Sequence, residues 1–124
     1  MEKGDVVLVH ATVFCHRTGG DLGPMNEARP ESHLVHSPAG VGDQRQLWRL
    51  PHKPWRGLVT GRTYLATGIV KYGYSGPYDS YDGDLELVED KRHIVLCVQP
   101  LDTKRWLKPW RCLEADLEVV AHDS

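Results

Sequence analysis

Apolar positions in this chain form short runs of β-branched and aromatic residues, separated by stretches rich in glycine, proline and aspartate. The first run, Asp5–Phe14, is rich in valine and lacks the spacing of three or four residues that marks a helix, so it predicts a strand. Gly57–Tyr72 carries three glycines among Thr, Tyr, Val and Ile. This composition predicts a bent strand or a pair of strands.

The second half of the chain continues in the same way. Pro100 ends one apolar run, and Pro109 confines another to a sheet edge because proline cannot donate to a ladder. The expected elements are strands at Leu85–Val88 and His93–Val98, an edge strand at Trp106–Cys112, a tight helical turn at Leu113–Asp116 and a closing strand at Leu117–Val120.

Two segments have the composition of loops. Gly73–Asp84 is rich in glycine, tyrosine and aspartate, which predicts a hairpin tip. A long polar stretch with several Gly and Pro residues predicts a loop insertion over residues 16–54. Because 124 residues suffice for one modest core, we expect a single β domain over residues 1–124.

No segment has a clear helical period, so an all-β fold of five to six short strands is predicted, either a small barrel or a sandwich. The opening Lys3–Val9 and the closing turn plus short strand resemble small SH3-like barrels of the KOW or Tudor type. That resemblance implies a protein that binds partners without doing chemistry. It also implies recognition through loops and exposed aromatic side chains.

A six-residue motif occurs twice. The segment from Lys53 to Leu58 recurs from Lys108 to Leu113, with Gly57 replaced by Cys112, and every tryptophan of the chain adjoins an arginine. Trp and Arg are common anchors of protein interfaces. Alternatively, the tryptophans fill a small core and the arginine stems cover them. The predicted binding residues are Trp48, Arg49, Trp55, Arg56, Arg105, Trp106, Trp110, Arg111, Tyr74 and Tyr78.

Charge is unevenly distributed although the formal net charge is only -2. Residues 44–62 and 91–111 hold most of the cations, whereas acidic residues gather at 79–90 and near the C-terminus. This layout favours docking on a partner protein with an acidic patch, as an inhibitor or an adaptor. Binding of nucleic acid or a nucleotide by the same basic, aromatic surface is the second hypothesis.

An enzymatic alternative rests on four short elements: His10-Ala11-Thr12, Gly20-Asp21-Leu22, Tyr64-Leu65 and Val98-Gln99-Pro100. Their order resembles the H-G-T, G-D-L, Y-L and V-x-P elements of rifamycin-type ADP-ribosyltransferases, although Ala11 stands where that family has glycine. The resemblance implies that NAD is bound. It would place His10 on the ribose, Tyr64 on the nicotinamide and Asp102 beside the reacting centre.

A metal or cofactor is not part of the main interpretation. The alternative is a zinc site built from Cys15, His16, His33 and His36. The three cysteines show no C-x-x-C spacing and are expected to be reduced thiols. The apolar run Val6–Val9 is too short for a signal peptide or a membrane span, which predicts a cytoplasmic protein without a membrane partner.

Overall fold

The computed structural model describes residues 1–18, 29–38, 43–74, 81–103 and 108–121, without the side chains of residues 17–18, 43, 70–74 and 81–89. The described residues form strands and one 3-10 turn, so the predicted all-β class is confirmed. No helix among them is long and apolar enough to cross a membrane. The elements are β1 (Val6–Thr18), β2 (His33–His36), β3 (Asp43–Tyr74), β4 (Tyr81–Pro100), β5 (Trp110–Cys112), η2 (Glu114–Asp116) and β6 (Leu117–Ala121).

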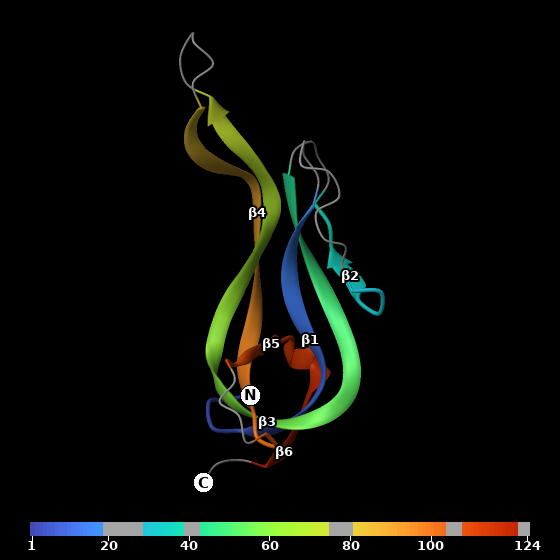
Figure 1. The fold of residues 1–124 in the computed structure, drawn as a ribbon. Coiled ribbons are helices and arrows are strands. Elements are labelled where there is room, and N and C mark those ends of the chain that lie inside the picture. The colour runs from blue at the N-terminus through green and yellow to red at the C-terminus, as the bar shows by residue number, and fades with distance from the viewer. Residues whose placement is uncertain (19–28, 39–42, 75–80, 104–107, 122–124) are drawn as a thin grey trace.

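Every strand pair among the described residues is antiparallel, and the strand order is β5-β4-β3-β1-β6, with β2 also paired to β3. Strand β3 is shaped like a U (Figure 1). Its first part pairs with β1 along residues 44–58, and its second part pairs with β4 from Gly57 onwards. A bulge between Val59 and Gly61 helps the strand to turn at the base.

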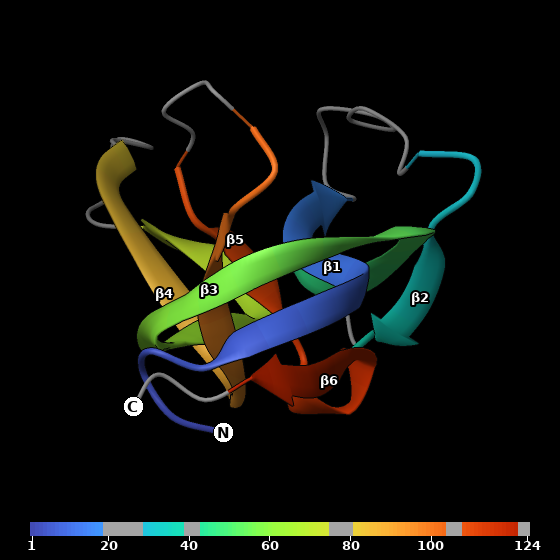
Figure 2. The same cartoon turned by 90° about the horizontal axis from the view of Figure 1, so that it is seen from below.

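The core lies between the two arms of this U. Side chains of β1 alternate, so Val7, Val9, Ala11 and Val13 are all buried. Figure 2, viewed from below, shows the strands arranged around this interior. Buried residues form a base cluster (Val7, Val9, Val59, Leu96, Val98, Cys112 and Leu117) and an upper cluster (Val13, Leu47 and Val95, with Cys15, Leu65 and Leu113 against it).

Gly57 makes the bend of β3 sterically feasible. A Cβ atom at this position would overlap Val98 Cγ1 and lie 2.9 Å from Cζ3 of Trp55. In the second copy of the six-residue motif, the equivalent position is Cys112, which is fully buried in the base cluster. The two copies therefore occupy different environments.

Strand lengths differ from those expected. The segment 16–54 was predicted as a loop, but β1 continues to Thr18, β2 lies within the segment and β3 already begins at Asp43. The polar side chains there belong to a strand with a solvent-facing side. Strands β3 and β4 have 32 and 20 residues, so the two strands predicted at Leu85–Val88 and His93–Val98 are one. The turn η2 and strand β6 lie where they were predicted.

Candidate functional site

The tryptophans of the two motifs lie in different surroundings. Trp55 packs against the base cluster and stacks on His52, with 5.7 Å between ring centroids and 16° between planes. Trp48 is half-buried opposite Phe14 and Leu34. Trp110 is 41% exposed. Trp55 thus fits the core interpretation, whereas Trp110 is a surface residue.

The arginines beside them also differ. Arg49 donates to Asp116 from Nε at 2.9 and 3.0 Å and from Nη2 at 2.7 Å. This hydrogen bonding raises the pKa of Arg49. Asp116 is buried in η2, so the pair ties β3 to the turn before the last strand. The charge of Arg49 is compensated inside the molecule, which gives this residue a structural role.

The structure describes only some of the remaining predicted binding residues. Arg56 and Arg111 are exposed. Arg105, Trp106 and Tyr78 lie outside the described residues, and of Tyr74 only the backbone is described. The described surface residues from the predicted set are therefore Trp110 and Arg111 on β5, and Arg56 at the base of β3.

A hollow of about 230 Å³ lies beside the exposed indole, and we call it the Trp110 hollow. Most of its lining is apolar, because Val13, Phe14 and Leu50 contribute to it. Arg29, which is exposed, adds a cation. The lining residues come from β1, β3, β5 and the segment before β2: Thr12, Val13, Phe14, Arg29, Leu50 and Trp110.

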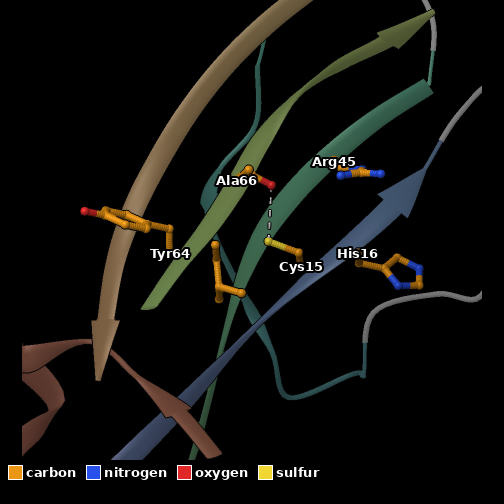
Figure 3. A pocket seen from close by; sticks show the side chains of 6 residues that line it. Cys15, His16, Arg45, Tyr64 and Ala66 are labelled. Carbon is orange, nitrogen blue, oxygen red and sulfur yellow. Dashed lines mark hydrogen bonds between the residues drawn. The ribbon is translucent and has the colours of Figure 1, made fainter. Parts of the chain in front are cut away.

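A second hollow, of about 260 Å³, follows along the same strand, and we call it the Cys15 hollow. Figure 3 shows Cys15 with Tyr64 on one side and Arg45 and His16 on the other. The thiol of Cys15 donates to the carbonyl oxygen of Ala66 at 3.6 Å and so links β1 to the second part of β3. The lining residues are Cys15, His16, Arg45, Tyr64, Leu65 and Ala66.

Cations dominate the surroundings of Cys15. Burial raises the pKa of its thiol, while the charges of Arg45 and Arg111 act in the opposite direction. Arg111 follows Trp110 on β5 and is not among the residues that line either hollow. Among the described residues, neither hollow is lined by an aspartate or a glutamate. One arginine lines each hollow, Arg45 at Cys15 and Arg29 at Trp110.

The residues of the enzymatic alternative are not assembled. Tyr64 lines the Cys15 hollow, but His10 precedes Cys15 by five positions, which is about 17 Å of extended strand. The ring of His10 instead lies 3.5 Å from Glu118. Asp102 is exposed in the turn after β4. Within the described part of the chain, no hydrogen bond or ion pair joins any two of these three residues.

The four residues of the zinc alternative do not share a site either. Cys15 and His16 are neighbours on one strand, and Cys15 contacts Ala66. His33 and His36 lie on β2, and the ring of His36 turns toward Thr67. In the described ranges, no three His, Cys, Asp or Glu side chains are close enough to share a metal ion.

Instead, the structure reveals a histidine cluster formed by His36, Thr67 and His93. The buried hydroxyl of Thr67 lies 2.8 Å from Nδ1 of His36 and 2.9 Å from Nε2 of His93. The two rings are 5.0 Å apart. Burial lowers the pKa of His93, as do the nearby charges of His36 and Lys91. This cluster joins β2 to β4 through β3.

The sequence did not indicate most of the residues that line the two hollows. Arg29, Arg45 and Phe14 carry no motif, and they share a hollow with Trp110 or Tyr64 only because the fold brings distant segments of the chain together. For Phe14 the sequence does give a signal. Side chains alternate between the two faces of β1, which places Phe14 on the face opposite the buried valines.

Comparison with known proteins gives no relative: no family model, no curated protein and no solved structure matches this chain. The interpretation of the site therefore rests on the residues that line the two hollows and on their charges.

Proposed function

We propose that this protein is a small SH3-like binding module that docks on a partner protein through the Trp110 hollow. The observation that carries the proposal is an exposed indole beside a mostly apolar hollow that Arg29 also lines. Tryptophan and arginine are the residues most often found at the energetic centre of protein interfaces. The SH3-like assignment is supported by the tight turn η2 that leads into the short strand β6.

The sizes of the hollows favour a protein ligand over a small molecule. Sites for small molecules and cofactors usually enclose about 300–1,000 Å³. The two hollows are smaller, at about 230 and 260 Å³. Each is suited to an amino-acid side chain that a partner inserts. A protein of this kind acts by occupying a surface, as an inhibitor or an adaptor does, and we place it in the cytoplasm, where its three thiols stay reduced.

A random peptide array probed with the wild-type protein and with Trp110→Ala tests the proposal. We expect a subset of peptides to bind the wild type and to lose binding to Trp110→Ala. Val120→Ala is the matched control, because Val120 is an exposed apolar residue on β6 and lines neither hollow. Peptide binding that Trp110→Ala leaves intact, or no peptide binding at all, would overturn the proposal.

Nucleic acid is the competing ligand for the same cations. A single-stranded oligonucleotide titrated at several salt concentrations separates the two hypotheses. Binding through phosphates weakens linearly on a log–log plot as salt rises. If the oligonucleotide binds with such a slope and no peptide binds, nucleic-acid binding replaces the proposed function. The proposal expects little or no oligonucleotide binding at physiological salt.

A further inference from the structure

We propose that His36 and His93 bind a divalent metal ion of the late first transition row, with the hydroxyl of Thr67 as a third ligand. The inference concerns the histidine cluster and does not depend on docking through the Trp110 hollow. It rests on the convergence of two ring nitrogens on one point and on the distance between the rings. Both histidines are only half-buried, so an ion can reach them from solvent.

The two ring nitrogens converge as metal ligands do. Nδ1 of His36 lies 2.8 Å from Oγ1 of Thr67, and Nε2 of His93 lies 2.9 Å from the same atom. In an octahedral site with metal–ligand bonds of about 2.1 Å, adjacent ligand atoms are about 3.0 Å apart. Small rotations of the rings therefore let the three atoms share one ion. Water molecules would complete its coordination shell on the open side.

The distance between the rings also fits two imidazoles on one ion. The centre of an imidazole lies about 3.2 Å from a metal ion that one of its nitrogens binds. Two such rings at bond angles of about 90–110° have their centres about 4.5–5.2 Å apart. The centroids of His36 and His93 are 5.0 Å apart. Among the described residues, this is the one pair of histidine rings in contact.

The hydrogen bonds within the cluster leave a lone pair for a metal ion. Imidazole binds metals through an unprotonated nitrogen. The hydroxyl of Thr67 has one proton, so it donates to one ring and accepts from the other. The first ring already directs a lone pair at the site, and the second gains one when its proton moves to its other nitrogen. Because the pKa of His93 lies below its ordinary value of 6.5, this ring is neutral at pH 7.5.

The donor atoms determine which metals are expected to bind. Imidazole suits Ni²⁺, Cu²⁺ and Zn²⁺, whereas Mg²⁺ and Ca²⁺ prefer oxygen ligands. In the described part of the chain, neither ring forms an ion pair with a carboxylate, so the imidazoles are the main ligands. Two imidazoles are half the ligand set of a structural zinc site, and we expect a dissociation constant of about 1–200 µM at pH 7.5.

Calorimetric titration with Ni²⁺ at pH 7.5 tests the site. We expect His36→Gln and His93→Gln each to bind Ni²⁺ at least about tenfold more weakly than the wild type, because each loses a ligand. His33→Gln is the matched control, because His33 is an exposed residue of the same strand as His36 and lies outside the cluster. It should bind Ni²⁺ within about twofold of the wild type, and Mg²⁺ should not bind. Binding of Ni²⁺ should weaken at least about tenfold at pH 5.5, where protons compete for the rings.

The outcomes bear on this site alone. If Ni²⁺ does not bind at 1 mM, or if both cluster variants bind it within about twofold of the wild type, the inference is wrong and the cluster is a hydrogen-bond network only. Circular dichroism checks that each variant is folded. If His93→Gln does not fold, His36→Gln decides the question, because His36 lies on the short strand β2. The peptide array with Trp110→Ala tests the proposed function separately.

Discussion

The ion pair between Arg49 and Asp116 offers a quantitative test of how the sheet is held to its closing turn. Replacing Asp116 with leucine leaves the Arg49 guanidinium without its partner at three hydrogen-bond distances of 2.7–3.0 Å. Removing one partner of a fully buried pair costs about 3–5 kcal/mol. The Asp116 side chain is 10% exposed but that of Arg49 is 34% exposed, so water compensates part of the loss. We expect about 2 kcal/mol.

Urea unfolding followed by circular dichroism measures this loss. For a chain of this length, about 2 kcal/mol corresponds to a decrease in Tm of about 8 °C. Arg49→Met leaves Asp116 buried without its cation and should cost a similar amount. The double variant Arg49→Met/Asp116→Leu should be more stable than either single variant, because no unpaired charge stays behind.

Glu114 provides the matched control. It lies 3.5 Å from the N-terminal amine, and its side chain is 65% exposed. Glu114→Gln should therefore change the free energy of unfolding by less than about 0.5 kcal/mol. If Asp116→Leu is as mild as Glu114→Gln, or if the double variant is as unstable as the sum of the single ones, the ion pair does not hold η2 to the sheet.

Two further stability predictions follow from the histidine cluster and the bend of β3. Because the pKa of His93 lies below its ordinary value of 6.5, the folded chain binds fewer protons than the unfolded chain just below that pH. The stability that His93 contributes is complete above pH 6.5 and is lost as the pH falls below that value. The free energy of unfolding in urea should therefore be lower at pH 5.5 than at pH 7.5. This difference should be smaller in His93→Gln. Gly57→Ala should cost about 1–3 kcal/mol because its Cβ overlaps Val98, and an unchanged Tm would contradict the packing at the bend.

Much of the fold could be predicted because it depends on local patterns. Strand β1 follows from its valine-rich alternation, and η2 and β6 follow from the last apolar residues of the chain. The length of β3 could not be predicted in this way. Its first part is polar on one face, and its bend requires that Gly57 lie against Val98, which is 41 positions away in the sequence.

The site was predictable only in part. Trp110 and Arg111 were selected because of the repeated motif, and both are on the surface. The same motif also selected Trp55, which packs against the core, because short sequence identity does not report on which face of a strand a residue lies. Arg45 and Tyr64 line one hollow from the two parts of β3, and no local signal indicates that they do.

The most direct test of the proposed function is the affinity of one array-selected peptide for three proteins, measured by fluorescence anisotropy. For a residue at the energetic centre of an interface, truncation costs about 2 kcal/mol or more, which is about a thirtyfold loss of affinity. The account predicts that Trp110→Ala binds the peptide at least about thirtyfold more weakly than the wild type, whereas Val120→Ala binds it equally well. An affinity of Trp110→Ala within about twofold of the wild type would contradict docking through the Trp110 hollow.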